Sequence, residues 1–142
     1  MEKLFQIVYT STASVPLSRE ELRELLKGSH ERNARAGITG LLLYKDGNFM
    51  QALEGGEIAV KNLFTKICDD RRHHGILTLI EGPIEHRQFP DSSMAFRDLN
   101  HEASRDIAGY SEFLNTPLNG DLLRKDLSRC ERLLLLFKKN IR

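Results

Sequence analysis

Three polar side chains fall on faces of this 142-residue sequence that are otherwise apolar. Tyr9 alternates with apolar residues in a strand-like run, and Gln51 stands between Phe49 and Leu53 in a second one. Asn33 continues the leucine stripe of a predicted amphipathic helix. Buried amides need hydrogen-bond partners, which leucine and isoleucine side chains cannot supply. A phenol, two amides and an apolar slot would together suit a flat heterocycle with amide-like edges.

Each of these side chains also has a purely structural interpretation. A buried tyrosine often keeps its hydroxyl at a wet rim, and a core asparagine or glutamine often ties down a loop. The heterocycle hypothesis therefore depends on the three side chains lying together, which requires the two strands and the helix to meet.

The other candidate motifs give weaker predictions. The adjacent His73 and His74 point in different directions on either a strand or a helix end, so we expect no metal site there. Cys68 and Cys130 lack CxxC spacing and are predicted to be small core residues. The run 69–72, Asp-Asp-Arg-Arg, is predicted to be a solvated helix end, with a ligand-proximal Asp70 as the alternative.

The elements that must position these side chains follow the order βαββαβ, with one further strand. Strands are predicted at 4–9, 38–44, 49–53, 76–80 and 94–99. One helix is predicted from about 19, after a capping box of Ser18 and Glu21, to a cap at Gly37, and another over 58–70. The segment from Gly37 to Gly40 lacks phosphate-loop spacing and indicates this cap followed by a closely approached strand. The order is typical of an α+β, ferredoxin-like sandwich in which two helices cover one face of a mixed sheet.

Composition limits the class of protein. Twenty-one basic and 20 acidic residues give a net charge of +1, which argues against a general nucleic-acid binder. A hydrophobic fraction of 40% is typical of a globular domain. The longest apolar run, 133–137, is too short to cross a bilayer, and the first residues lack a signal-peptide pattern. We therefore expect a cytoplasmic protein without membrane contact.

The chain is predicted to divide into a core of residues 1–100 and a helical C-terminal extension of residues 101–142. The second helical pattern of the extension carries a leucine-rich seam, which consists of Leu122, Leu123, Leu127, Cys130, Leu133, Leu134 and Phe137. Such a seam needs a partner surface, which is either the uncovered face of the sheet or a second chain.

Five stretches of the sequence, taken in order, resemble the BLUF domains, which are blue-light sensors that use a flavin. They are 7–11 (IVYTS), 33–42 (NARAGITGLL), 46–55 (DGNFMQALEG), 70–74 (DRRHH) and 89–96 (FPDSSMAF). The resemblance covers residues 2–100, and the C-terminal extension resembles the two-helix extension of short, stand-alone members.

The resemblance implies a role for individual residues. Tyr9 matches the tyrosine that donates an electron and a proton to the excited flavin, and Gln51 matches the glutamine whose hydrogen bonds rearrange after light. Asn33 matches the residue that holds the O4/N3 edge of the flavin, and Met94 matches the methionine that passes the change to the fifth strand. Residues expected along the outer part of the flavin site are Arg32, Lys66, Asp70 and His73.

The sequence departs from many family members at three positions. Ser92 stands where a tryptophan is common, and the chain has no tryptophan, so Tyr9 would donate its electron without a tryptophan competitor. Lys66 replaces a common arginine, and Arg32 a common asparagine or histidine. FAD is the expected cofactor, with FMN and riboflavin as alternatives.

The protein implied by this resemblance is a blue-light photoreceptor and not an enzyme, because the flavin undergoes no net conversion. Its expected partners are the flavin, a second copy of the chain and a downstream protein. The alternative is a ferredoxin-like regulatory module that binds a small metabolite or a partner protein without photochemistry. An RNA-binding module of this topology would need exposed aromatics on its central strands, where 38–44 has mostly leucine.

Overall fold

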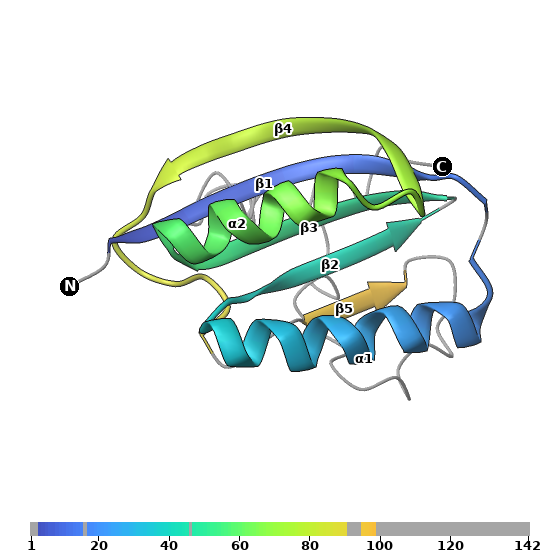
Figure 1. Ribbon diagram of the computed structural model, residues 1–142, viewed down its shortest axis with the longest axis horizontal. Helices are drawn as coiled ribbons and strands as arrows, with labels where there is room; N and C mark the ends of the chain where they lie inside the picture. The colour runs from blue at the N-terminus through green and yellow to red at the C-terminus, as the bar shows by residue number, and fades with distance from the viewer. Residues whose placement is uncertain (1–2, 16, 46, 91–94, 99–142) are drawn as a thin grey trace, which may run out of the picture.

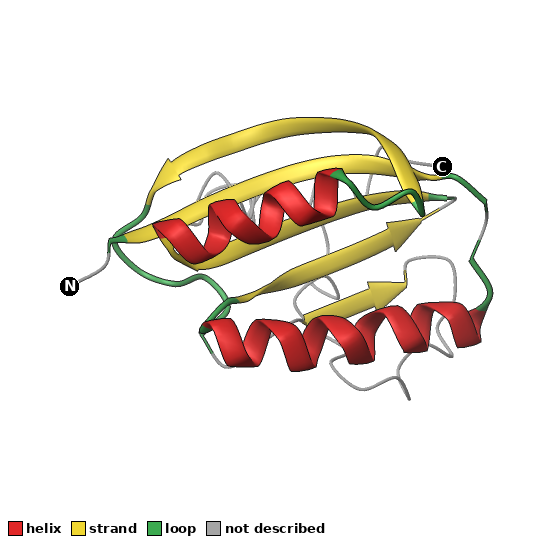
Figure 2. Ribbon diagram, viewed as in Figure 1, coloured by secondary structure: helices red, strands yellow, loops and turns green. Residues whose placement is uncertain are grey.

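The computed structural model describes residues 3–15, 17–45, 47–90 and 95–98, which form one sheet and two helices (Figures 1 and 2). The elements in chain order are β1 (Leu4–Ala13), α1 (Arg19–Ala36), β2 (Thr39–Lys45), β3 (Asn48–Gly56), α2 (Glu57–Cys68), β4 (His73–Pro83) and β5 (Ala95–Asp98). This confirms the predicted βαββαβ order with one further strand. The predicted C-terminal helices of residues 101–142 lie outside the described residues.

The sheet has the strand order β4-β1-β3-β2-β5. β1 lies between β3 and β4 and pairs antiparallel with both, whereas β2 pairs antiparallel with β3 and parallel with β5. The connection from β1 through α1 to β2 therefore skips the place that β3 fills, which is the split βαβ arrangement of a ferredoxin-like fold. Both helices lie on the same face of this mixed sheet (Figure 1).

Helix α1 begins and ends with the caps that the sequence predicts. The Ser18 hydroxyl accepts a hydrogen bond from the Glu21 amide at 3.1 Å, and the Glu21 carboxylate accepts one from the Ser18 amide at 3.0 Å. Gly37 follows the helix with a φ of 69°, a left-handed conformation that glycine adopts without strain. The buried Leu22 and Leu26 turn the apolar stripe of the helix toward the sheet.

Strands β2 and β3 form a hairpin in which the two backbones approach closely at Gly40. A Cβ atom at this position would lie 2.0 Å from the carbonyl oxygen of Ala52, so the contact requires glycine. The resulting register places Leu42 opposite Gln51, and Gln51 opposite Tyr9 of β1. The hairpin therefore brings the two residues singled out on the strands into one row across the sheet.

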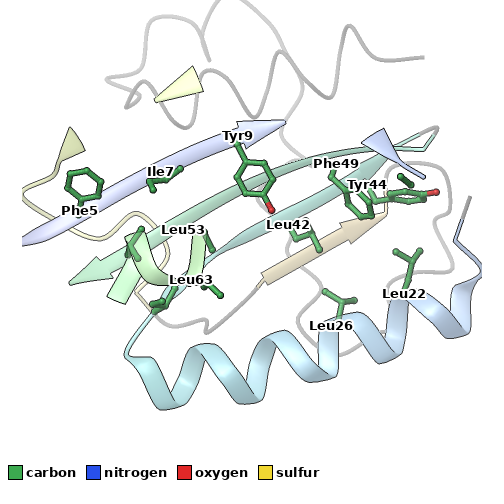
Figure 3. Packing of buried hydrophobic residues seen from close by; sticks show 13 residues of the cluster. Phe5, Ile7, Tyr9, Leu22, Leu26, Leu42, Tyr44, Phe49, Leu53 and Leu63 are labelled. Carbon is green, nitrogen blue, oxygen red and sulfur yellow. The ribbon is translucent and has the colours of Figure 1, made fainter. Parts of the chain in front are cut away.

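The strands β1, β2 and β3 have buried residues on both faces of the sheet. On the face that the helices cover, Ile7 and Tyr9 belong to an apolar cluster with leucines of α1 and α2 (Figure 3). On the opposite face Val8, Leu41 and Leu43 are each 0% exposed. Neither α1 nor α2 lies on that second face (Figure 1).

Three strands are longer than the sequence predicts. β3 spans Asn48–Gly56 instead of 49–53. β1 continues through the polar run 10–12 to Ala13, and β4 begins at His73 instead of at 76. The two extensions pair with each other, since Ala13 is the register partner of His73 and Thr12 that of His74. The hydrogen bonds of this ladder satisfy backbone groups that a turn would leave to water, so they override the local composition.

Candidate functional site

An open cavity of about 580 Å³ lies between the two helices and the face of the sheet that they cover. This volume includes space that is open to solvent. The cavity has apolar walls, to which Leu25, Leu42, Phe49 and Ile67 contribute. Residues singled out in the sequence also line it, namely Tyr9, Arg32, Gln51, Lys66, Asp70 and His73. The cavity therefore combines apolar surface with a small set of polar groups, as binding sites for organic ligands do.

Tyr9 and Gln51 form a hydrogen-bonded pair where the sheet meets the cavity. They are register partners on β1 and β3, and the Tyr9 hydroxyl donates to the Gln51 Oε1. The two residues are only 3% and 5% exposed. Burial raises the pKa of Tyr9, and the charge of a Cys68 thiolate would raise it further. The phenol therefore keeps its proton at neutral pH and serves as a hydrogen-bond donor.

Two rings pack against Tyr9. The ring centroid of Phe64 in α2 lies 5.4 Å away at an interplanar angle of 53°, and that of His73 in β4 lies 6.4 Å away in an edge-on arrangement. Tilted and edge-on contacts are favourable geometries for aromatic rings. They hold the phenol ring in place, so that its hydroxyl stays directed at Gln51.

His73 is fixed by hydrogen bonds at both ring nitrogens. Its Nε2 lies 2.7 Å from the carbonyl oxygen of Ile67, and its Nδ1 lies 2.8 Å from the hydroxyl of Ser11. Because a carbonyl only accepts, Nε2 carries the hydrogen. His74 is directed elsewhere, with its Nδ1 3.4 Å from the Ser14 hydroxyl. This confirms that the adjacent histidines do not face a common site.

Asp70 and Arg72 form an ion pair at the cavity. The Arg72 Nε lies 2.9 Å from Asp70 Oδ2, and the Arg72 amide donates to Asp70 Oδ1 at 2.9 Å. These hydrogen bonds lower the pKa of Asp70 to about 2, so the carboxylate is charged at neutral pH. The run 69–72 matches both of its interpretations in part. Arg72 is exposed, as predicted for a solvated helix end. Asp70 lines the cavity, as predicted by the ligand-proximal alternative.

Asn33 is fully buried in α1, which confirms that its side chain lies on the core face. Ser29 and Arg32 of the same helix line the cavity, whereas Asn33 is not among the residues that line it in the described part of the chain. The structure therefore brings Asn33 to the correct helix and the correct face. Met94, the fourth residue of the implied site, lies outside the described residues.

Two polar cavity residues, Ser29 and Arg72, are absent from the predicted site, and one cysteine is misplaced. Ser29 interrupts the leucine stripe of α1 one turn before Asn33, and that interruption was a usable signal. Arg72 was treated only as part of a charged helix end, because its partner Asp70 comes into range only in the folded turn. Cys68 is exposed, so the prediction that it is a core residue was wrong. It is the last residue of α2.

Metal binding and membrane insertion have no support in the described residues. Within them, no group of three or more histidine, cysteine, aspartate or glutamate side chains is placed to hold a metal ion. Neither helix in this part of the chain is long and apolar enough for a bilayer crossing.

The donor set of the cavity fits a flavin. A flavin ring is flat and largely apolar on its faces, and its polar edge both donates and accepts hydrogen bonds. The apolar walls suit the faces, while the Gln51 amide can both donate and accept at the edge. Arg32 and Lys66 offer cations for a phosphate-bearing tail, as charge-assisted contacts to phosphate require.

Comparison with known proteins gives a consistent result. Residues 4–95 match the BLUF family, described as sensors of blue-light using FAD. The photoactivated adenylate cyclase subunit beta of Euglena longa is 41% identical over 87 residues, which are 61% of this chain and 10% of that protein. The blue light- and temperature-regulated antirepressor BluF of Escherichia coli (strain K12) is 30% identical over 104 residues, 73% of this chain and 26% of that protein. The chain thus spans only a small part of the length of these curated relatives.

A solved structure of BlrB, a BLUF protein in its dark state, extends the likeness to almost the whole chain. It has 34% sequence identity and a TM-score of 0.69, and the match covers 96% of this chain and 93% of that one. The family match includes both strands that carry the Tyr9–Gln51 pair. This chain therefore belongs to the BLUF family of blue-light sensors, which bind a flavin.

Proposed function

We propose that Tyr9 and Gln51 are the pair through which this chain converts light absorption into a structural change. The observation that carries the proposal is their buried hydrogen bond inside a cavity that fits a flavin. When bound, the flavin supplies light absorption and an excited state that accepts an electron. The protein supplies the donor, the proton path and the switch.

Tyr9 is the electron and proton donor in this proposal. Its phenol is oxidisable, and its proton already points at an acceptor, the Gln51 Oε1. Loss of an electron together with a proton leaves a neutral side chain, so no uncompensated charge remains on a residue that is only 3% exposed. The return of both in the dark restores the starting state, and the chain shows no net conversion after a cycle.

Gln51 is the switch. A glutamine amide has an acceptor and a donor at the same end, so rotation or tautomerisation exchanges them without burying a charge. The Oε1 now faces Tyr9. After light, a different edge of the amide would face both Tyr9 and the flavin, and this local change would bias a two-state element.

The other predicted site residues bind the ligand. Arg32 on α1 and Lys66 on α2 lie on opposite walls of the cavity and would hold the phosphate-bearing tail of FAD or FMN. Asp70 and His73 would shape the outer end of the site, where each is already fixed by neighbours. Asn33 would hold the amide-like edge of the ring, and Met94 would pass the change to β5.

We infer that residues 101–142 form a helical extension that covers the second face of the sheet. The support is the burial of Val8, Leu41 and Leu43 on a face that carries neither α1 nor α2. The leucine-rich seam defined above offers a complementary apolar surface. Residues 1–100 would then be the photosensor, with the extension as its second layer.

The output of this domain is proposed to be a protein contact and not a reaction of its own. The E. coli relative is named an antirepressor, a function that acts on another protein, while the Euglena relative is a cyclase subunit much longer than this chain. We therefore propose a downstream protein partner, a second copy of the chain, or both, as the receiver of the signal.

The test is the absorption spectrum of the purified chain after incubation with FAD, FMN or riboflavin. We expect a yellow protein whose flavin band shifts reversibly to the red under blue light. A chain that takes up none of the three flavins, or that takes one up and shows no shift, would contradict the proposal.

A further inference from the structure

The connection between β4 and β5 must cross the end of the sheet, because the two strands lie at opposite edges. Its described part, residues 84–90, passes the end of β3 and the beginning of β2 (Figure 1). Backbone amides in such a crossing leave the strand ladder and need other acceptors. In this chain, a buried carboxylate provides acceptors for two of these amides.

Glu54 provides acceptors for two of these amides. Its Oε2 accepts from the Gln88 amide at 2.7 Å, and its Oε1 accepts from the Phe89 amide at 2.6 Å. The Thr39 hydroxyl donates to Oε1 at 2.9 Å. Glu54 is 0% exposed, and a carboxylate is stable at such a position only when hydrogen bonds replace its water. Three donors fulfil that requirement here.

Arg87 completes the cluster. Its Nη1 donates to the Thr39 hydroxyl at 2.8 Å and to the backbone carbonyl of Glu54 at 3.2 Å, and its Nη2 donates to the carbonyl of Gly37 at 2.9 Å. The Thr39 hydroxyl thus accepts from the cation and donates to the carboxylate. We call this set the Glu54 anchor: Glu54, Thr39, Arg87 and the amides of Gln88 and Phe89. It ties the crossing segment to β3, to β2 and to the end of α1.

β5 is the strand to which this segment leads. It has four residues and, among the strands described, pairs with β2 alone, so the sheet itself fixes it weakly. Its Phe96 is the register partner of Leu42, which pairs with Gln51, which pairs with Tyr9. β5 therefore lies in the same row as the Tyr9–Gln51 pair, two strands from Gln51.

We propose that Glu54 is a positioning residue for signal output, because its carboxylate holds the crossing segment so that β5 stays in the row of Gln51. This inference rests on the proposed role of Gln51 as the switch. A rearrangement at Gln51 then reaches β5 only while the Glu54 anchor is intact. Glu54 is not among the described residues that line the cavity, so the anchor is separable from flavin binding.

The test is Glu54→Gln in the full chain. The two carboxylate oxygens face different amides, so a glutamine in either orientation turns its NH₂ toward a backbone N–H. We expect normal flavin uptake and a normal red shift. We expect about tenfold faster hydrogen exchange of residues 84–90 in the dark, because a buried hydrogen bond is lost. The light-minus-dark exchange difference of residues 95–98 should disappear.

Glu81→Gln is the matched control, since Glu81 is an exposed carboxylate on β4. It should leave dark exchange and the light-dependent difference unchanged. If Glu54→Gln does not fold, Thr39→Val removes the bridging hydroxyl at similar volume and should give the same pattern at smaller amplitude.

Each remaining outcome is decisive. An unchanged light-dependent difference at 95–98 in a folded Glu54→Gln or Thr39→Val chain would overturn the inference, as would a wild-type chain that shows a red shift but no such difference. A wild-type chain without a red shift would remove the proposed function and, with it, the output role. Faster dark exchange in Glu54→Gln would in that case still identify the anchor as structural.

Discussion

The Tyr9 phenol and the Gln51 amide share a property that suits a buried switch, which is that neither carries a net charge in any state that the mechanism uses. Burial raises the pKa of Tyr9, so the hydroxyl keeps its proton and donates to Gln51 Oε1. A charged side chain in the same place would resist every rearrangement, because its solvation would have to be rebuilt each time. At the residue scale, the hydrogen bonds of Tyr9 and Gln51 can therefore rearrange at a low cost in free energy because both side chains are neutral.

Tyr9→Phe should abolish the red-shifted state while flavin remains bound, because the ring keeps its packing and only the hydroxyl is lost. The loss of one buried hydrogen bond should lower the free energy of unfolding by about 1 kcal/mol. Tyr44→Phe is the matched control, since Tyr44 is also buried and its hydroxyl accepts from the Leu17 amide at 3.4 Å. A normal photocycle in Tyr9→Phe, measured by absorption under blue light, would refute the donor assignment.

Gln51→Leu should also abolish the red shift, for a different reason. Leucine has neither donor nor acceptor, so the buried Tyr9 hydroxyl loses the acceptor that it now has. Leaving a buried donor unsatisfied should reduce the free energy of unfolding by about 1–3 kcal/mol, measured by urea denaturation of the flavin-free chain. A red shift of normal size in this variant would show that another residue is the switch.

The ion pair of Asp70 with Arg72 predicts that the free energy of unfolding falls at acid pH. Its hydrogen bonds to Arg72 hold its pKa at about 2, below the value of the unfolded chain, so the folded state binds fewer protons between these two values. The stability from this pair is complete above pH ~4 and is lost as the pH falls toward about 2. Asp70→Asn should flatten that part of the unfolding curve, whereas Asp69→Asn, at an exposed neighbour, should not. If the free energy of unfolding falls equally with pH in the wild type, Asp70→Asn and Asp69→Asn, the Asp70–Arg72 pair is not the cause.

At the scale of elements, the sequence correctly predicted the features that depend on residues close together in the chain. The capping box, the Gly37 cap and the alternation that buries Tyr9 and Gln51 all depend on residues close in the chain, and all are found. The ends of β1 and β4 depend on pairing between distant residues, and the ion pair of Asp70 with Arg72 depends on the shape of a turn. Neither the distant pairing nor the conformation of the turn follows from periodicity, which is why these features were missed.

Gly40 also depends on a contact with another strand, so its substitution should destabilise the fold. A methyl group there would lie 2.0 Å from the carbonyl oxygen of Ala52, so Gly40→Ala must push β2 away from β3 at a contact between two backbones. We expect a loss of about 3 kcal/mol or more in unfolding free energy, together with weaker flavin binding. Gly28→Ala is the control, because nothing lies within 4 Å of its Cβ position in α1, and it should stabilise the helix by up to about 1 kcal/mol. Similar denaturation midpoints for the two variants would contradict this account of the hairpin.

At the scale of the whole molecule, the sheet has one face for the ligand and one face that the described helices leave to another layer. Val8, Leu41 and Leu43 are closed to solvent on that second face. The Glu54 carboxylate is on the same face by strand alternation, since it differs from Gln51 by an odd number of residues. Glu54 therefore lies on the face that the proposed helical extension would cover, opposite to the cavity.

If the leucine-rich seam of the same chain forms that layer, Leu134→Glu should expose apolar surface and lower the unfolding free energy by about 3 kcal/mol, because a charge would enter a buried contact. Arg132→Glu is the control, because it lies on the opposite side of the predicted helix from Leu134. Within one chain, the unfolding midpoint should not depend on protein concentration. A midpoint that rises with concentration, together with a dimer mass by light scattering that Leu134→Glu reduces to that of a monomer, would instead place the seam of a second copy on this face.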